Sequence, residues 1–288
     1  MKIPKELFVN CQKGPERKAW MSGLPVLFRE LETRWSLRVG EPFDPAGSCS
    51  WVAPATRANG ESAVLKLAMP HMEGQDEISG LGFWNGNGIV KLLEADLESG
   101  AMLLERCLPG TTLHSEPEPR QDEVVANLLK QIWSLTRNPS DLSGFRPLSL
   151  MIEFWCRETI AQRHLWPDAG LVNEGLRVFK EIGRPALTDV LLATDLHAGN
   201  VLRSQREPWL VIDPKPFVGD RAYDPVQHLM NCETRLHRDP IELVRWVADL
   251  TEVDAERLRL WTLARAAADP RDDWKDARWM RTARKLAL

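Results

Sequence analysis

The stretch Leu191-Leu-Ala-Thr-Asp-Leu-His-Ala-Gly-Asn-Val-Leu202, followed by Trp209-Leu-Val-Ile-Asp213, decides how this chain is interpreted. An apolar run leads to Asp195, Asn200 comes five residues later, and a second apolar run ends at Asp213. Short apolar runs bounded by turn residues predict strands at 190–193, 201–203 and 209–212, with a turn at 204–207. The pattern therefore predicts a compact β patch carrying two carboxylates and one amide side chain.

This trio of side chains fits phosphoryl transfer. One carboxylate can deprotonate an attacking hydroxyl, while an amide and a second carboxylate hold magnesium on the phosphates of a nucleotide. Magnesium takes oxygen ligands and keeps several waters, so one Asn and one Asp are enough beside the phosphates. We predict Asp195 as the base and Asn200 and Asp213 as metal ligands. The alternative, that Asp195 and Asn200 merely form a tight turn, is disfavoured by the strands expected on both sides.

These segments resemble the aminoglycoside and hydroxyurea phosphotransferases, specifically their streptomycin 6-kinase branch. The run from Asp195 to Leu202 is similar to one that many small-molecule kinases share, whereas the run from Pro208 to Pro225 is similar to one specific to this branch. The resemblance extends from about Phe28 to the C-terminal helices. It implies a two-lobed protein-kinase-like fold, ATP or another nucleoside triphosphate, Mg²⁺, and a hydroxyl acceptor on an antibiotic or sugar-like molecule.

One departure from the family pattern lies at Ala193-Thr194-Asp195, where the family usually has His-Gly-Asp. The missing His normally braces the catalytic loop against the metal-binding segment, and its loss removes no catalytic atom. We therefore expect a working or weakened aminoglycoside-type kinase. Two alternatives stay open: a kinase of a metabolic alcohol or sugar, and a nucleotide-binding pseudokinase or regulatory module.

Two charged residues in the N-terminal part are further candidates. Ala63-Val-Leu-Lys66 resembles the family's strand that ends in a nucleotide-contacting lysine, and Glu77 could hold Lys66 as an ion pair. Glu73 and Asp76 compete with Glu77 for this role. The plain alternative is a strand-end lysine whose stem covers apolar surface, beside a solvated helix glutamate.

Two segments are expected to meet the nucleotide mainly through their backbone. The small residues of Gly47-Ser-Cys-Ser-Trp-Val-Ala53, among them Ser48 and Ser50, would let backbone N–H groups approach phosphate oxygens, although an ordinary hairpin turn is nearly as good an interpretation. Leu103-Leu-Glu-Arg-Cys107, which includes Glu105, resembles the segment joining the lobes, whose backbone would bind the adenine edge.

Three residues are expected to support the catalytic segments. We predict that His197 bonds its ring to loop backbone rather than transferring a proton. Lys215 could reach phosphate, or the flanking prolines could direct it to solvent. Asp224 is expected to N-cap a helix, and the resemblance suggests that it also braces the catalytic loop. Acids eligible to bind a cationic acceptor are Glu153, Glu158, Asp168, Asp220 and Asp239.

The overall pattern predicts an α+β chain with a strand-rich first part and a helical second part. Strands are expected at 35–39, 50–55, 63–68, 89–93 and 101–106, with one helix from about 71 to 84. Beyond a proline-rich crossing at 108–119, helices are expected at 121–137, 150–165, 171–183, 222–232, 241–250, 255–268 and within 272–288. We predict a nucleotide-binding lobe at 1–106 and a catalytic, substrate-binding lobe at 107–288.

Composition sets further limits. The 288 residues are 43% apolar and 27% charged, with a formal charge of −4, which suits a folded protein and argues against a general nucleic-acid binder. The five cysteines are scattered, which argues against a disulfide framework or zinc site. The chain shows no signal peptide pattern and no apolar run long enough to cross a bilayer. We expect a cytoplasmic, monomeric protein without a membrane or nucleic-acid partner.

Overall fold

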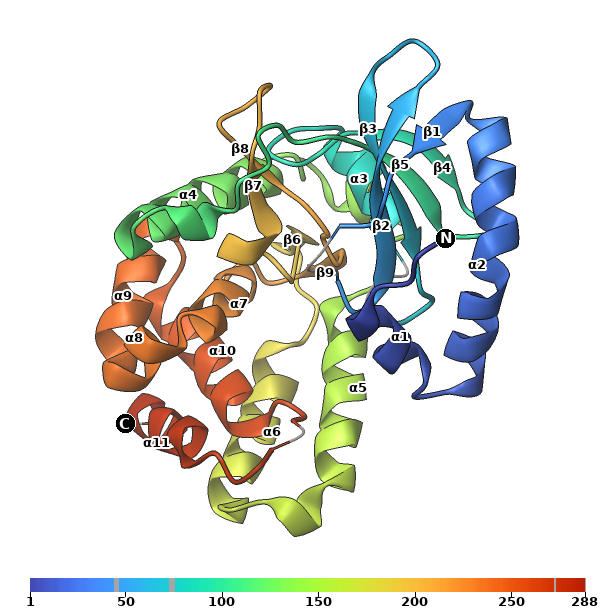
Figure 1. Ribbon diagram of the computed structural model, residues 1–288. Helices are drawn as coiled ribbons and strands as arrows, with labels where there is room; N and C mark the ends of the chain where they lie inside the picture. Colours follow the sequence, from blue (N-terminus) through green and yellow to red (C-terminus); the bar gives the residue numbers. More distant parts are fainter. Residues whose placement is uncertain (44–46, 73–75, 272, 288) are drawn as a thin grey trace. The chain divides into compact units, whose positions relative to one another are not determined.

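The computed structural model describes residues 1–43, 47–72, 76–271 and 273–287. Its internal contacts divide the chain into two compact units, whose elements are labelled in Figure 1. The first unit comprises Met1–Thr111 with Arg203–Leu210, and the second comprises Thr112–Leu202 with Val211–Leu288. The first is strand-rich and the second mostly helical, as predicted. The assignment of nucleotide binding to 1–106 and of catalysis to 107–288 stays a prediction.

The first unit is built on a five-stranded antiparallel sheet with strand order β1-β2-β3-β5-β4. Its strands are β1 (Leu37–Val39), β2 (Ser50–Arg57), β3 (Ser62–Ala68), β4 (Leu92–Asp96) and β5 (Ala101–Glu105), and its helices are α1 (Lys5–Cys11), α2 (Pro15–Arg34) and α3 (Glu77–Trp84). Successive side chains of a strand point to opposite faces. The central strand β3 therefore sends Leu65 and Leu67 to one face and Lys66 to the other.

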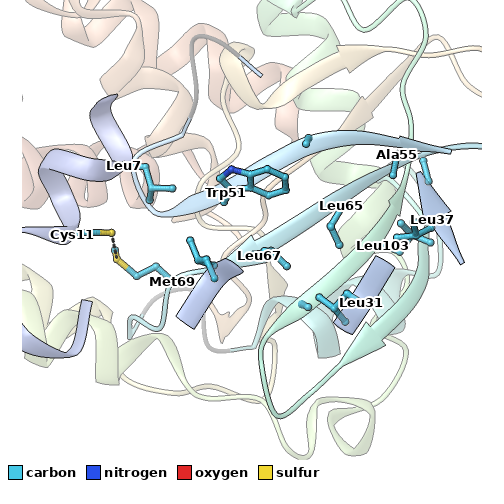
Figure 2. Close-up of a cluster of buried hydrophobic side chains, with 14 residues drawn as sticks. Leu7, Cys11, Leu31, Leu37, Trp51, Ala55, Leu65, Leu67, Met69 and Leu103 are labelled. Carbon is cyan, nitrogen blue, oxygen red and sulfur yellow. Dashed lines mark hydrogen bonds between the residues drawn. The ribbon is translucent and has the colours of Figure 1, made fainter. Parts of the chain in front are cut away.

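A buried apolar cluster covers one face of this sheet. Trp51 of β2, Leu65 and Leu67 of β3 and Leu103 of β5 pack with side chains from α1 and α2 (Figure 2), among them Leu7. Leu24 and Leu31 of α2 belong to the same cluster, spaced seven residues apart and hence two turns apart on one side of the helix. This core fixes the sheet and leaves the Lys66 face for α3.

The sequence patterns failed at two places in this unit. Helices α1 and α2 were not predicted, because charged residues interrupt their apolar positions and Pro25 lies inside α2. The strand expected at 89–93 begins instead at Leu92. Ile89 and Val90 are buried in the segment before it, while acidic Glu94 and Asp96 belong to the strand. β4 is an edge strand, where charged side chains are well tolerated.

The second unit packs its helices around α10. That helix contacts α6, α7, α9 and α11, and a side chain at Gly175 of α6 would meet the Cβ atoms of Ala267 and Ala268 at 2.9 Å. The helices are α4 (Glu118–Trp133), α5 (Leu148–Ala161), α6 (Ala169–Ile182), α7 (Asp224–Asn231), α8 (Glu233–Arg238), α9 (Pro240–Thr251), α10 (Ala255–Ala268) and α11 (Ala277–Leu286), with short 3₁₀ turns at Leu113–Ser115, Pro139–Leu142, Arg163–Leu165 and Ala198–Asn200. The expected long helices are confirmed, whereas α8 was not predicted.

The β patch forms as two small sheets. β6 (Val190–Leu192) pairs antiparallel with β9 (Phe217–Gly219), and β7 (Val201–Arg203) pairs with β8 (Trp209–Val211). The three predicted strands are present, and β9 is an addition. Its three residues are too few for a periodic signal, and Pro216 precedes them. Within the described parts of the chain, no helix is long and apolar enough to span a membrane.

Candidate active site

The loop after β6 is cross-linked to the segment after Asp213. The carbonyl of Ala193 accepts hydrogen bonds from the N–H groups of Asp195 at 2.7 Å and Lys215 at 2.8 Å. Thr194 has a positive φ of 47°, a left-handed conformation that is strained for a β-branched residue. Its hydroxyl donates to the Lys215 carbonyl at 2.6 Å. These bonds join the loop to the segment that follows Asp213.

The structure brings the three predicted catalytic residues together within the second unit. The Asn200 side chain donates through Nδ2 to the Asp195 carbonyl at 3.0 Å. The Asn200 carbonyl accepts from the N–H of Ile212, the neighbour of Asp213, at 2.9 Å. With Nδ2 turned to Asp195, the metal contact predicted for Asn200 would be made by its Oδ1 atom. Asp195, Asn200 and Asp213 thus belong to one small, hydrogen-bonded constellation.

Asp213 lies beside a lysine. It has a positive φ of 53°, and its Oδ1 is 2.6 Å from the Nζ of Lys215. The Asp213 side chain is 37% exposed, whereas that of Lys215 is only 11% exposed. The expectation that the flanking prolines might turn Lys215 to solvent is therefore wrong. The Asp213 carboxylate, which is predicted to bind metal, therefore already pairs with the Lys215 ammonium.

Asp224 binds the backbone of the catalytic loop. Its fully buried carboxylate accepts hydrogen bonds from the N–H groups of Ala193 at 3.1 Å and Thr194 at 2.7 Å, and from Trp133 Nε1 at 2.8 Å. Burial raises the pKa of Asp224 to about 6 in spite of these bonds. The expected N-cap role is wrong, because α7 begins at Asp224 itself with Tyr223 as the N-cap, and the carboxylate is turned to the loop. The expected contact with the loop is present.

His197 bonds its ring to the loop backbone, as expected. Its Nδ1 accepts a hydrogen bond from the N–H of Gly199 at 3.1 Å. Burial and the neighbouring His114 lower the pKa of His197 to about 4. The ring is therefore neutral at pH 7 and carries its proton on Nε2. This geometry supports a structural role for His197.

In the first unit, Lys66 and Glu77 form a buried ion pair. Lys66 Nζ is 2.5 and 2.7 Å from the two carboxylate oxygens of Glu77, and the side chains are 6% and 3% exposed. Lys66 comes from β3 and Glu77 from the first turn of α3. The pairing predicted from the sequence is present. The competing Glu73 lies outside the described residues.

The other residues predicted to meet the nucleotide have structural partners. The Glu105 carboxylate accepts from Arg206 Nε at 2.9 Å and from the N–H of Lys91 at 3.0 Å, while its own N–H bonds the Lys91 carbonyl. Ser50 is buried as the first residue of β2, and Ser48 is exposed with its carbonyl bonded to Asn10. Phosphate and adenine contacts at these positions stay predictions.

Three of the five acids considered for binding a cationic acceptor have structural hydrogen-bond partners. Asp168 and Asp239 cap α6 and α9 by accepting hydrogen bonds from Leu171 and Glu242 N–H groups. Asp220 accepts from Arg257 and from Trp261 Nε1. Glu153 and Glu158 are exposed on α5.

A second cluster has the composition of a metal site. One ligand atom each of Asp122, His228 and Cys232 lies within 4.8 Å of the others. The guanidinium of Arg235, however, donates to both oxygens of Asp122 at 2.7 Å and to Cys232 Sγ at 3.3 Å. An organic cation therefore already fills the position that a metal ion would take.

Sequence reasoning missed two residues at Asp195. Gln227 of α7 donates through Nε2 to Asp195 Oδ1 at 2.8 Å, and Arg265 of α10 donates to Gln227 Oε1 at 2.7 Å. Both are 32 or more residues from Asp195 in sequence and occupy ordinary helix positions. No local pattern distinguishes them from solvated helix residues.

Comparison with a family model and with individual proteins points to the same family. Residues 34–273 match the family described as aminoglycoside/hydroxyurea antibiotic resistance kinase. A streptomycin 6-kinase from Streptomyces glaucescens is 37% identical over 276 residues, which cover 92% of this chain and 88% of that protein.

Solved structures share the fold at low identity. A choline kinase from Streptococcus pneumoniae matches with a TM-score of 0.61 at 17% identity, over 91% of this chain and 98% of that one. An aminoglycoside phosphotransferase, in ternary complex with AMP-PNP and hygromycin B, matches with a TM-score of 0.59 at 16% identity, over 90% and 97%. The predicted two-lobed kinase-like fold is thereby confirmed.

Proposed function

The chain belongs to the aminoglycoside/hydroxyurea antibiotic resistance kinases, and on that premise we propose that it transfers the terminal phosphate of ATP to a hydroxyl of a streptomycin-like aminoglycoside. It is a small-molecule kinase that uses a nucleotide. The observation that carries the proposal is the constellation of Asp195, Asn200 and Asp213, tied together by the bonds of Asn200.

The proposed chemistry assigns one role to each group. Asp195 accepts the proton of the attacking hydroxyl, and Lys66, held by Glu77, neutralises charge on the nucleotide phosphates. The donor set fits magnesium, because the Asn200 amide oxygen and the Asp213 carboxylate are hard oxygen ligands. Lys215, whose Nζ is 2.6 Å from Asp213 Oδ1, would have to share this carboxylate with the metal ion. When bound, magnesium would neutralise charge on the transferring phosphate.

The acceptor follows from the relatives. The S. glaucescens relative is named for streptomycin, and the family description adds hydroxyurea. The alternatives, a metabolic alcohol kinase or a pseudokinase, find no such support, and the bonds of Thr194 and Asp224 hold the loop without the family's His. A cytoplasmic location and a monomeric state stay predictions.

The test measures ATP consumption and acceptor phosphorylation with streptomycin, other aminoglycosides, amino sugars, hydroxyurea and simple alcohols. We expect turnover with streptomycin or a close analogue, and Asp195→Asn should abolish it while nucleotide binding persists, because the amide keeps the shape and loses the base. Asp254→Asn is the matched control, since Asp254 caps α10 and Asn caps a helix equally well. Turnover by Asp195→Asn near the wild-type rate would refute the assignment of the base.

A further inference from the structure

Residues of α1, and those just before it, contact the segment 47–53, which is predicted to approach the nucleotide phosphates. Asn10, in the last turn of α1, donates through Nδ2 to the Ser48 carbonyl at 2.9 Å. The carbonyl of Lys2, which precedes α1, accepts from Trp51 Nε1 at 2.8 Å. The family match begins at residue 34, so both contacts are made by residues that lie outside it. The segment is thus held at two points from the N-terminal side of the first unit.

The orientation of the Asn10 amide is determined by Arg17 of α2. Arg17 Nη1 donates to Asn10 Oδ1 at 2.7 Å. A guanidinium has only donors, so it must face the amide oxygen, and the amide NH₂ must then face Ser48. The same NH₂ group lies 3.5 Å from the Sγ atom of Cys49. One amide therefore joins α1, α2 and segment 47–53, and its two polar atoms cannot exchange places without losing both bonds.

The helix that carries Asn10 is itself held by the core of the sheet. Cys11, the next residue, contacts Met69 with a distance of 3.9 Å between the two sulfur atoms (Figure 2), and both side chains are buried. The N–H of Met69 donates to the Cys49 carbonyl at 2.9 Å. α1 therefore contacts segment 47–53 directly through Asn10 and packs on the strand end that bonds the same segment.

These contacts fix two successive peptide units of the segment. The Ser48 carbonyl points to Asn10, and the Cys49 carbonyl points to Met69. A peptide unit is planar and almost always trans, so its N–H points away from its carbonyl. The Cys49 N–H is therefore turned away from Asn10, and the Ser50 N–H away from Met69. Binding of an anion by backbone N–H groups depends on directions that are set in this way.

We propose that Asn10, oriented by Arg17, is a positioning residue that holds segment 47–53 in the shape that binds the nucleotide phosphates. The proposal rests on the proposed kinase function and on the phosphate contact expected for this segment. It gives α1 and α2 a part in nucleotide binding, in addition to covering the sheet. A merely structural contact would change folding alone, whereas a positioning contact must also change the affinity for ATP.

Asn10→Asp provides the sharpest test, because it replaces the donor by an acceptor with little change in shape. Arg17 would hold one carboxylate oxygen, and the other would face the Ser48 carbonyl, so that two acceptors oppose each other. The segment should then leave the position that Asn10 now fixes. We expect the Kd for ATP, measured by calorimetry without acceptor, to rise roughly tenfold. At saturating ATP, kcat should stay within about twofold of the wild-type value.

Two further variants keep the proposal testable if Asn10→Asp folds poorly. Asn10→Ala removes the donor without adding charge and should raise the Kd for ATP several-fold. Arg17→Leu leaves the amide free to flip, so the Kd should rise by a smaller factor. Asn59→Asp is the matched control, since Asn59 Oδ1 accepts a hydrogen bond from the Glu61 N–H and Asp can still accept it. That control should bind ATP like the wild type.

Hydrogen exchange of segment 47–53, followed by mass spectrometry without ATP, tests the contact independently of turnover. We expect faster exchange in Asn10→Asp and Asn10→Ala than in the wild type and in Asn59→Asp. A wild type that binds ATP but phosphorylates no acceptor would refute the proposed function and leave this proposal standing. Unchanged exchange in the folded Asn10 variants, or faster exchange with an unchanged Kd for ATP, overturns the positioning role.

Discussion

Two buried carboxylates of the second unit, Asp122 and Asp224, are satisfied in opposite ways. Asp122 accepts from Arg235 at 2.7 Å and from His228 at 2.8 Å. Both partners are cations, since the bond to Asp122 outweighs the effect of burial and raises the pKa of His228 to about 9. Among the described residues, the hydrogen-bond partners of Asp224 are the neutral N–H groups of residues 193–194 and of Trp133. Both side chains are almost inaccessible to water, yet one is stabilised by opposite charge and the other by dipoles alone.

The pKa values of the two carboxyls follow from this difference. Burial would raise the pKa of Asp122, but the bonds from Arg235 and His228 outweigh it and lower the pKa to about 2. For Asp224 burial dominates, and the pKa is raised to about 6. Asp122, whose charge is paired with cations, links the helices that carry these residues. Asp224, which is held by neutral donors, orients the catalytic loop, and burying its charge costs stability.

The largest effect is expected for Asp122→Ala. Removing this anion leaves Arg235 and His228 without their buried counter-charge, and breaking a buried pair in this way costs about 3–5 kcal/mol. The free energy of unfolding, measured by urea titration, should fall by that amount. Turnover per folded molecule should change less than stability, because the side chains that donate to Asp122 are those of His228, Arg235 and Trp246 and not residues of the catalytic loop.

Glu252→Gln is the control for this prediction. Glu252 pairs with Lys130 at 2.8 Å and so also joins α4 to the end of α9, but its side chain is 74% exposed. Exposed pairs contribute little to stability, so this variant should unfold like the wild type. Equal losses in both variants would remove the distinction between the buried and exposed pairs.

The second prediction concerns pH. Because the folded pKa of Asp224 is about 6, above the ordinary value of 3.8, the protonated form is favoured by folding. Its contribution is complete below pH 3.8 and is lost as pH rises through about 6. Relative to Asp224→Asn, the wild type should therefore lose roughly 3 kcal/mol of stability across this window, at about 1.4 kcal/mol for each pKa unit.

Asp122, the carboxyl paired with cations, gives stability the opposite dependence on pH. With its pKa lowered to about 2, Asp122 contributes stability above pH 3.8 that is lost as pH falls through 2. The advantage of wild type over Asp122→Asn should thus shrink on acidification, while its advantage over Asp224→Asn grows. Urea titrations at several pH values measure both slopes, and the same slope for both variants would contradict the comparison.

The sequence predicted where Asp195, Asn200 and Asp213 lie better than it predicted the residues that hold them, while their catalytic roles stay predictions. Strands end where turn residues begin, so the spacing of Asp195, Asn200 and Asp213 was enough to place them on one β patch. The Lys66–Glu77 pair was also predicted, since a strand-end lysine and a following helix have a short path between them. These residues are brought together by short stretches of chain, so their spacing in the sequence was enough to predict that they lie close to one another.

Features that depend on distant packing left no such signal. The backbone N–H donors to Asp224 come from residues 30 and 31 positions away, and Trp133 is 91 positions away. The place of Asp224 as first residue of α7 led to the wrong expectation of a cap. Gln227 and Arg265 are defined only by what the fold places beside them. Helix α2 is held by the sheet it covers, so its sequence, interrupted by Pro25, did not indicate a helix.

The smallest effect is expected at Thr194, whose hydroxyl adds a second tie to the loop that Asp224 holds. Thr194→Ser keeps the bond to the Lys215 carbonyl and removes the branched methyl at positive φ, so stability and kcat should match the wild type. Thr194→Ala loses the bond and should cost about 1 kcal/mol with a few-fold lower kcat. Thr194→Gly relieves the backbone strain but also loses the bond, and therefore separates the two effects. If Gly and Ser variants turn over equally, the hydroxyl is dispensable, and the bonds of Asp224 are enough to hold the loop.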